Sequence, residues 1–311
     1  MDNLSSRRSV ECVVKDDKSF ALKHLPLTSG SLGELNILRT LQGHPNIIKL
    51  VSDHLSNQHL VVCMEYHERT LLDIVLQYED GMPLSRIKRI FSQLLSALHH
   101  VHTSGYVHHD IKLDNILVGA DDRIYLIDFG FAKAYTSGQH SLRNNGGTLH
   151  YAAPEIWLKR ACEGPEADIW ALGVCLFLMV TSCFPFGGTT ASEIWKEIKR
   201  GGLWKNEILK QEPMLYDLLT QMLAWDIRWR IRLSEIPQHP WMMPSRGFGA
   251  SRSDPPSDHR AIPAGFPDTR RRSRSHADEP STSSAVPVKP KSRSIMKKIF
   301  NHRKNRSSQR T

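Results

Sequence analysis

The spacing of apolar residues changes once along this chain, near residue 70, and the change limits the folds that the chain can adopt. Before it, short apolar runs at 10–14, 20–22, 47–51 and 59–66 have the length and the bounding turns of strands. After it, apolar residues recur every three or four positions, first from 71 to about 102 and then over most of the stretch that ends near Trp241. The pattern predicts a small β-rich lobe followed by a larger helical one.

Three parts are therefore predicted, in an α+β fold: a lobe at 1–67, a lobe at 68–243 and a tail at 244–311. The tail is rich in Ser, Pro and Arg, so it cannot bury enough apolar surface to offset the cost of ordering it. It holds 16 Lys+Arg against 5 Asp+Glu, whereas the first 243 residues hold 25 against 27. Any attraction for anionic partners belongs to the tail.

The composition excludes several other classes of protein. The five cysteines are scattered and form no CxxC pair, which argues against a disulfide framework or a zinc ribbon. No signal-like apolar segment opens the chain, and the longest apolar run, at 170–180, is shorter than the roughly 18 residues that a membrane span needs. We therefore expect an intracellular protein, located in the cytoplasm, the nucleus or both.

Two polar loops, each beside a short apolar strand, carry residues suited to chemistry. They are VHHDIKLDN at 107–115 and IDFG at 127–130, after the apolar run that starts at Ile124. Two carboxylates and an amide on such loops can place oxygen ligands around a hard cation such as Mg²⁺, and a third carboxylate can accept a hydroxyl proton.

This spacing resembles the catalytic loop HRDLxxxN and the metal-binding DFG of eukaryotic protein kinases. Further motifs occur in the same order: FALK at 20–23, HPNIIKL at 44–50, MEY at 64–66, GTLHYAAPE at 147–155, DIWALG at 168–173, Arg230, and HPW at 239–241. The resemblance covers about residues 5–243 and implies the two-lobed kinase fold. The DIK triplet and Thr148 resemble serine/threonine kinases, and GHPNII, LHYAAPE and HPW resemble the calmodulin-dependent and AMP-activated kinase group.

The resemblance assigns roles to single positions. Lys23 is similar to the strand lysine that neutralises the nucleotide phosphates, and Glu34 is similar to its helix partner. Asp110 would orient and deprotonate the substrate hydroxyl, and Lys112 would hold the transferred phosphoryl group. The implied ligands of Mg²⁺ are Asn115 and Asp128.

The same resemblance places the adenine base of ATP against the segment 64–67. Met64 would be the gatekeeper, Glu65 and His67 would form the hinge, and Leu117 would lie beneath the ring. The implied scaffold residues are Glu155, Asp168 and Arg230.

The glycine-rich loop of the family has no counterpart in this sequence. Counting back from Val10 places Asn3, Ser5 and Arg8 where glycines would let backbone amides approach the phosphates. The first strand of the family is expected to be missing as well. We therefore expect weaker binding of ATP, but not its loss.

The segment between Lys23 and Glu34 also departs from the family, because it is short and contains a proline and two glycines. Such residues disfavour helix, so the helix is expected only at 33–41 and the Lys23–Glu34 pair is expected to form imperfectly.

The third departure is His109, which stands where the family has the arginine of HRD. That arginine pairs with a phosphate on the activation loop, and a neutral imidazole cannot do so well at pH 7. Acceptors for phosphorylation are present at Thr136, Ser137 and Ser141. We expect phosphorylation of this loop to matter less than is usual in the family.

The basic tail has several interpretations. Near its end, in 292–310, apolar residues lie on one helical face amid Lys and Arg, which suits an anionic membrane surface or a calmodulin-like groove. The tract RRRSRS at 270–275 is typical of RNA binding or of a nuclear address, but the tail has few aromatic residues on which bases could stack, so nucleic acid is not the expected partner. A tail that binds nothing tightly stays an alternative. The protein is expected to be a monomer.

Two functions from different classes remain. The first is transfer of the γ-phosphoryl group of Mg·ATP to Ser or Thr hydroxyls of protein substrates. The second is a pseudokinase scaffold that binds partners through the fold and the tail. The absent glycines favour the scaffold, whereas five retained polar residues favour the enzyme, which we prefer. These residues are Lys23, Asp110, Lys112, Asn115 and Asp128.

Overall fold

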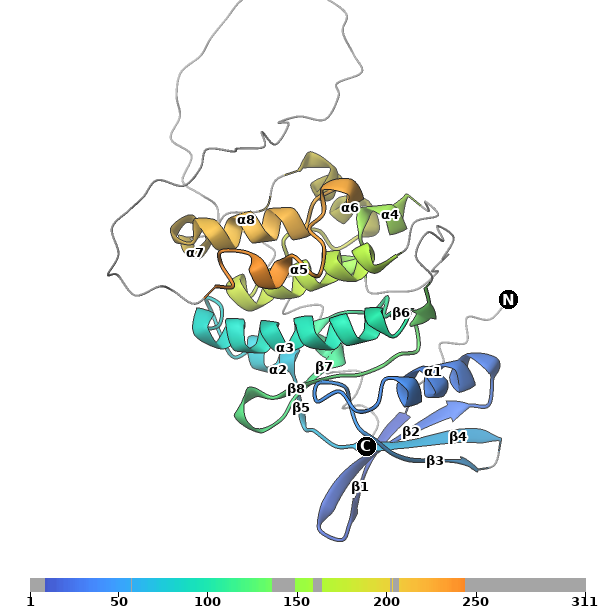
Figure 1. Ribbon diagram of the computed structural model, residues 1–311. Helices are drawn as coiled ribbons and strands as arrows, with labels where there is room; N and C mark the ends of the chain where they lie inside the picture. The colour runs from blue at the N-terminus through green and yellow to red at the C-terminus, as the bar shows by residue number, and fades with distance from the viewer. Residues whose placement is uncertain are drawn as a thin grey trace, which may run out of the picture. The chain divides into compact units, whose positions relative to one another are not determined.

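The computed structural model describes residues 9–56, 58–135, 149–158, 164–201, 203 and 207–243 (Figure 1). Several sequence-based expectations lie outside these residues: the glycine-loop positions Asn3, Ser5 and Arg8, the activation-loop residues 136–148 with Thr148 and Ser141, and the tail at 244–311.

The first lobe is built on a four-stranded antiparallel sheet with the strand order β1-β2-β4-β3. The strands are β1 (Ser9–Lys15), β2 (Lys18–Pro26), β3 (Leu50–Ser56) and β4 (His59–Glu65). The turn of the first hairpin has a positive φ at both Asp16 and Asp17, at 51° and 58°, as the twist of a two-residue hairpin requires. The expected hairpin is therefore present.

The third strand begins later than the expected run 47–51. Ile47 and Ile48 precede β3 and are 4% and 1% exposed. They belong to the main hydrophobic core, and Ile47 makes an isolated parallel bridge with Leu126. A short apolar run can be buried without being a strand, which is why periodicity alone misplaced this boundary.

Helix α1 (Ser29–Thr40) begins four residues before the expected start at Gly33. Its N-cap is Thr28, whose side-chain oxygen accepts a hydrogen bond from the backbone N–H of Ser31 at 3.1 Å. A cap of this kind stabilises a helix by about 1 kcal/mol, which offsets the cost of one internal glycine. The expected late start was therefore wrong.

The second lobe is mainly helical. Its helices are α2 (Leu71–Val75), α3 (Leu84–Thr103), α4 (Pro154–Trp157), α5 (Pro165–Thr181), α6 (Ala191–Arg200), α7 (Glu207–Gln211) and α8 (Pro213–Met222). Short strands form two small sheets, β5-β7-β8 and β6-β9: β5 (Arg69–Thr70), β6 (Tyr106–Val107), β7 (Ile116–Val118), β8 (Ile124–Leu126) and β9 (Lys133–Ala134). No helix of the described residues is long and apolar enough to cross a membrane.

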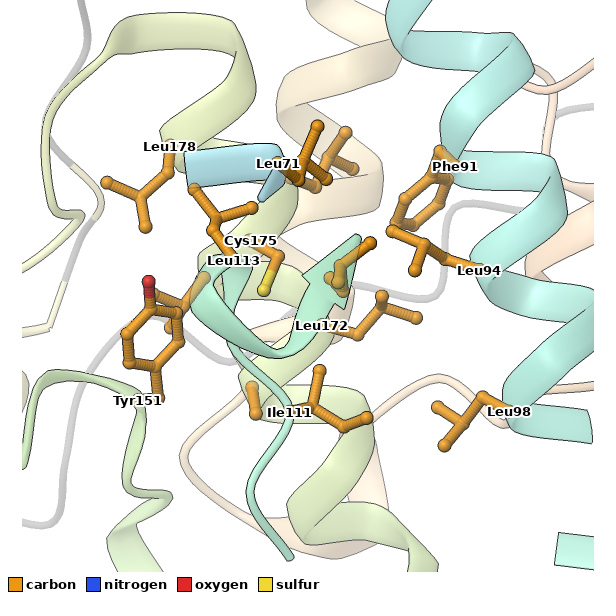
Figure 2. Packing of buried hydrophobic residues seen from close by; sticks show 14 of the residues in the cluster. Leu71, Phe91, Leu94, Leu98, Ile111, Leu113, Tyr151, Leu172, Cys175 and Leu178 are labelled. Carbon is orange, nitrogen blue, oxygen red and sulfur yellow. The ribbon is translucent and has the colours of Figure 1, made fainter. Parts of the chain in front are cut away.

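Helix α5 lies at the centre of this lobe and is buried on every side from Ala167 to Thr181. A helix that is apolar all round must be enclosed by other elements. Figure 2 shows Leu172 and Cys175 of α5 close to Ile111 and Leu113, which belong to the loop after β6. The loop with the candidate catalytic residues is thus packed on the most buried helix.

The two lobes are joined by hydrogen bonds as well as by the chain. The carbonyl of Asn46 accepts a hydrogen bond from the N–H of Leu126 at 2.8 Å, and the Asn46 side chain donates to the carbonyl of Ile124 at 2.9 Å. The N–H of Ile48 donates to the carbonyl of Leu126 at 3.1 Å. These bonds attach the segment after α1 directly to β8.

Candidate active site

Lys23 lies on β2 and is only 6% exposed, although it carries an ammonium group. Its Nζ donates to Oε1 of Glu34 on α1 and, at 3.0 Å, to Oδ1 of Asp128. Two carboxylates thus offset the cost of burying the charge. The expectation of an imperfect Lys23–Glu34 pair was wrong, because the longer α1 brings Glu34 within reach.

Asp110 lies on the loop after β6 and is 4% exposed. Lys112 donates to its Oδ2, and Nδ2 of Asn115 donates both to Oδ2 and to the Asp110 carbonyl, each at 2.9 Å. The structure therefore brings Asp110, Lys112 and Asn115 into one network. Two donors on one carboxylate oxygen fix the direction in which the carboxylate points.

Asp168, near the start of α5, anchors this loop. Its two carboxylate oxygens accept the backbone N–H groups of His108 and His109, each at 2.8 Å, and Oδ2 also accepts from Nε2 of His102 at 2.9 Å. Burial alone would raise the pKa of Asp168, but the hydrogen bond from His102 and the electrostatic attraction of the neighbouring imidazoles lower it to about 2. The carboxylate is thus ionised at neutral pH.

A second loop, after β8, carries Asp128 and is tied to the first. The N–H of Ile127 donates to the carbonyl of Asn115 at 3.0 Å, and Nε2 of His108 donates to the carbonyl of Ile127 at 3.1 Å. His109 and Asp128 both have positive φ values, 63° and 64°. Such backbone is rare outside glycine and is retained where the surroundings fix it, often at functional sites.

Asn115 and Asp128 fit a magnesium ion by their chemistry. The amide nitrogen of Asn115 faces Asp110, so the amide oxygen is left for a ligand, and Asp128 offers a carboxylate. Both are hard oxygen donors of the kind that Mg²⁺ prefers. In the parts of the chain that the structure describes, no three His, Cys, Asp or Glu side chains gather as a metal cluster. An ion held here would therefore complete its shell with phosphate oxygens and water.

The segment expected to meet the base follows the end of β4. Met64 pairs with Ala21 across the sheet, and Leu117 pairs with Tyr125 across the β7–β8 hairpin. The carboxylate of Glu65 lies 3.5 Å from Nζ of Lys49, and the ring of His67 stacks on Tyr125. The side chains of Glu65 and His67 thus have protein partners, so of the hinge it is the backbone that is suited to contact a base.

Comparison with known proteins decides the family. The profile described as "Protein kinase domain" matches residues 8–242. The chain belongs to the protein kinase family. The expected superfamily and two-lobed fold are therefore confirmed.

Relatives of this kinase include named serine/threonine kinases. It is 35% identical over 222 residues to "Sperm motility kinase Z" of Mus musculus, an alignment that covers 71% of this chain and 44% of that protein. It is 33% identical to "Probable serine/threonine-protein kinase MARK-A" of Dictyostelium discoideum, covering 67% and 19%, and 33% identical to "Carbon catabolite-derepressing protein kinase" of Secale cereale, covering 67% and 41%. The kinase thus spans less than half the length of these curated relatives. They agree with the serine/threonine type and with the expected group.

His109 distinguishes this kinase from the pattern of its family. The side chain is 7% exposed, and within the described residues neither ring nitrogen has a hydrogen-bond partner. Burial lowers the pKa of His109, against the opposing effect of the Asp168 charge. A neutral, buried imidazole lacks the positive charge with which an arginine binds a phosphate.

The scaffold residues of the kinase form a buried ion pair. Arg230 donates to both carboxylate oxygens of Glu155, at 2.6 and 3.0 Å, and to the carbonyl of Glu166 at 2.8 Å. Both side chains are almost fully enclosed. The pair joins α4 to the loop after α8, so it supports the end of the activation segment.

Two residues on the first strand share the face of the sheet that carries Lys23, but they were not assigned to the site from the sequence. Val10 pairs with Lys23 and Cys12 pairs with Ala21, so all four side chains lie on the same face of the sheet. Val10 is 59% exposed, and Cys12 is exposed as well. The hairpin register, counted from the DD turn, is the signal that could have identified them.

Proposed function

We propose that this chain is an active serine/threonine protein kinase, which transfers the γ-phosphoryl group of ATP to hydroxyls of protein substrates. The observation that carries the proposal is the pair of polar networks described above, whose loops are joined by the backbone hydrogen bond from Ile127 to Asn115. Lys23 contacts Glu34 and Asp128, and Asp110 contacts Lys112 and Asn115. Phosphoryl transfer requires mainly positioning and charge stabilisation, which such networks supply.

In this proposal Asp110 orients the substrate hydroxyl and accepts its proton. The hydroxyl oxygen forms the new bond to the γ-phosphorus, the bond from that phosphorus to the β–γ bridging oxygen breaks, and ADP departs with the electron pair. Lys112, next to Asp110, stabilises the phosphoryl oxygens during the transfer. The hydrogen bonds that the loop donates to Asp168 keep the loop in place throughout.

Lys23, Asn115 and Asp128 hold the nucleotide in this proposal. Lys23 neutralises charge on the phosphates, and its ion pair with Glu34 fixes the position of the Lys23 ammonium group. Asn115 and Asp128 would hold Mg²⁺, which supplies charge neutralisation to the transferring phosphoryl group. The base would lie between Val10, Ala21 and Met64 on one side and Leu117 on the other.

The test is transfer of phosphate from labelled Mg·ATP to a generic protein such as casein. The wild type should label the substrate on Ser or Thr, and Asp110→Asn and Asp128→Asn should abolish labelling while melting at temperatures close to that of the wild type. Labelling by wild type and both variants alike would indicate a contaminating kinase. No labelling by a wild type that is folded would overturn the proposal.

The second candidate is the pseudokinase scaffold, and it rests on a specific observation. Positions 3, 5 and 8 carry Asn, Ser and Arg instead of glycine. A scaffold would bind nucleotide weakly or not at all and would show no turnover. Calorimetric titration of the full chain with Mg·ATP and with Mg²⁺ alone, beside the labelling assay, separates the two functions.

For the tail we propose that the segment 292–310 binds an anionic membrane surface or a calmodulin-like partner, with the protein as a monomer. Ile295, Met296, Ile299 and Phe300 flank Lys297 and Lys298 there, and further basic residues follow up to residue 310. Co-sedimentation of the full chain with vesicles of 30% phosphatidylserine, compared with a chain ending at residue 289, tests the first partner. Titration with Ca²⁺-loaded calmodulin tests the second, and light scattering measures the oligomeric state.

We further propose a cytoplasmic or nuclear location. The tract RRRSRS at 270–275 has the charge density of a nuclear address. A fluorescent fusion in which its four arginines are replaced by alanine should shift from nucleus to cytoplasm if the tract acts in this way. Accumulation of the wild-type fusion in a secretory organelle would overturn the proposed location.

A further inference from the structure

Two aromatic rings meet where the chain passes from β4 into the second lobe. The rings of His67 and Tyr125 stack with centroids 4.1 Å apart and planes 15° from parallel. His67 lies two residues after the end of β4, and Tyr125 lies in the middle of β8, three residues before Asp128. The stack therefore connects the hinge to the strand that leads to a proposed metal ligand.

Gly119 packs closely against both rings of this stack. A Cβ atom at Gly119 would lie 3.0 Å from Cε2 of Tyr125 and 3.3 Å from Nδ1 of His67, closer than ordinary van der Waals contact. The backbone of Gly119 has φ −94°, so its conformation does not itself demand glycine. The glycine is explained by the space that the two rings occupy.

The stack lies on the side of the β7–β8 hairpin that faces the base. Tyr125 is the cross-strand partner of Leu117, so their side chains share one face of the hairpin. Leu117 is the residue expected beneath the adenine ring, and the segment 64–67 is expected along its edge. The contact between His67 and Tyr125 therefore links the segment expected along the edge of the base to the strand pair that carries Leu117, expected beneath it.

His67 is placed for stacking and not for hydrogen bonding. In the described part of the chain its Nε2 is buried and has no hydrogen-bond partner. Burial lowers the pKa of His67 and outweighs the opposing charge of Glu65, so the ring is neutral at pH 7. A neutral ring on a phenol ring gains the offset-stacking energy of an aromatic pair.

We propose that the His67–Tyr125 stack is a positioning pair that fixes the separation between the hinge backbone and Leu117 and thereby sets the affinity for the purine base. The inference rests on the proposed function, because it assumes that the cleft binds ATP. Because the glycine-loop positions of this chain lack glycine, contacts to the base would contribute more of the affinity for ATP, and contacts to the phosphates less, than in a kinase with that loop. Neither residue contacts the phosphates in this arrangement, so the effect should be specific for the base.

The experiment measures dissociation constants of the full chain by calorimetry for two probes, Mg·ATP and inorganic tripolyphosphate with Mg²⁺. The variants are Gly119→Ala, whose Cβ would press on both rings and displace them, and Tyr125→Leu, which keeps apolar volume but removes the ring. Tyr125→Phe keeps the stack and serves as the conservative rescue. Gly187→Ala is the matched glycine control, because nothing lies within 4 Å of a Cβ there.

We expect Gly119→Ala and Tyr125→Leu to weaken Mg·ATP binding by about fivefold to tenfold, the effect of losing one aromatic pair. Tyr125→Phe and Gly187→Ala should stay within about twofold of the wild type, and the affinity for tripolyphosphate should be unchanged throughout. Tyr125→Leu keeps the test decisive if Gly119→Ala does not fold.

Failure of the inference is distinguishable from failure of the proposed function. A wild type that binds neither probe overturns the proposed function. A wild type that binds Mg·ATP while Gly119→Ala and Tyr125→Leu bind it equally well overturns the positioning role. Equal loss of both probes in these variants also overturns it, because the stack would then be supporting the whole lobe and not the base site.

Discussion

The two halves of the candidate active site are built in different ways. On the side of the second lobe, Asp110 is held by Lys112 and Asn115, and its loop is held by Asp168 on a helix buried all round. On the side of the first lobe, the site is bounded by the β1–β2 hairpin, in which Val10 is 59% exposed. The contact that holds this side together is the ion pair from Lys23 to Glu34. The proposed catalytic residues are therefore held by many contacts, and the proposed nucleotide-binding residues by few.

The largest expected effect tests the densely connected half. Asp110→Asn should lower kcat by about 10³-fold, because it removes the proton acceptor and leaves the shape of the loop intact. Steady-state kinetics with saturating Mg·ATP measure it. Asp121→Asn is the matched control, since Asp121 is an exposed acid just after β7 whose φ of 54° asparagine tolerates well. A loss of less than tenfold in Asp110→Asn would remove this residue from the mechanism.

The next effect tests the sparsely connected half. Glu34→Gln should lower kcat/KM by about tenfold to hundredfold, because the bond from Lys23 loses its charged acceptor while the bond to Asp128 remains. Asp53→Asn is the control beside the same helix: it breaks the Arg39–Asp53 pair, in which the Arg39 side chain is 52% exposed, and should change stability by less than about 1 kcal/mol. Steady-state kinetics measure kcat/KM for both variants. An equal loss of kcat/KM in Glu34→Gln and Asp53→Asn would contradict a role for the buried Lys23–Glu34 pair in nucleotide binding.

A third effect concerns pH and the anchor of the catalytic loop. The folded-state pKa of Asp168 is about 2, below its ordinary value of 3.8, so its ionised form stabilises the fold. This contribution, on the order of 2 kcal/mol, is complete above pH 3.8 and is lost as the pH falls towards 2. Urea unfolding from mildly acidic pH down towards the pKa of Asp168 should therefore show a steeper decline for wild type than for Asp168→Asn. Parallel declines would contradict the assignment.

A smaller effect concerns the start of α1. Thr28→Ala should destabilise the protein by about 1 kcal/mol, because the N–H of Ser31 loses its acceptor, and Thr28→Ser should restore most of the loss. Thermal unfolding measures both. Full stability in Thr28→Ala would show that packing alone, without the cap, sets where α1 begins.

The smallest expected effect concerns the activation loop. Ser141→Ala should leave kcat/KM within tenfold of the wild type, because the neutral, buried imidazole of His109 lacks the positive charge with which an arginine binds a phosphate. The comparison requires protein treated with phosphatase and protein treated with Mg·ATP. A loss beyond tenfold would show that this loop is regulated through another cationic group.

Most of the polar half of the site could be predicted from the sequence, because its residues lie at short, fixed spacing. Asp110, Lys112 and Asn115 lie within six positions, so local loop geometry brings them together. The start of α1 was predicted too late in the chain. The low helix propensity of Gly30 and Gly33 is evident from the sequence, whereas the stabilisation by the Thr28 cap depends on a hydrogen bond that the structure shows. Val10, Cys12 and the His67–Tyr125 stack were missed as well, since they depend on strand register and on contacts between distant segments.

The attachment of Asn46 and Ile48 to β8 has a consequence for how the two lobes can move apart. The lobes are connected by the chain at residues 65–67 and by the hydrogen bonds of residues 46–48 to residues 124–126. These two connections are neighbours, because the N–H of Glu65 donates to the carbonyl of Lys49 at 3.1 Å. A motion that parts the lobes therefore has to bend the chain beside these hydrogen bonds or break them.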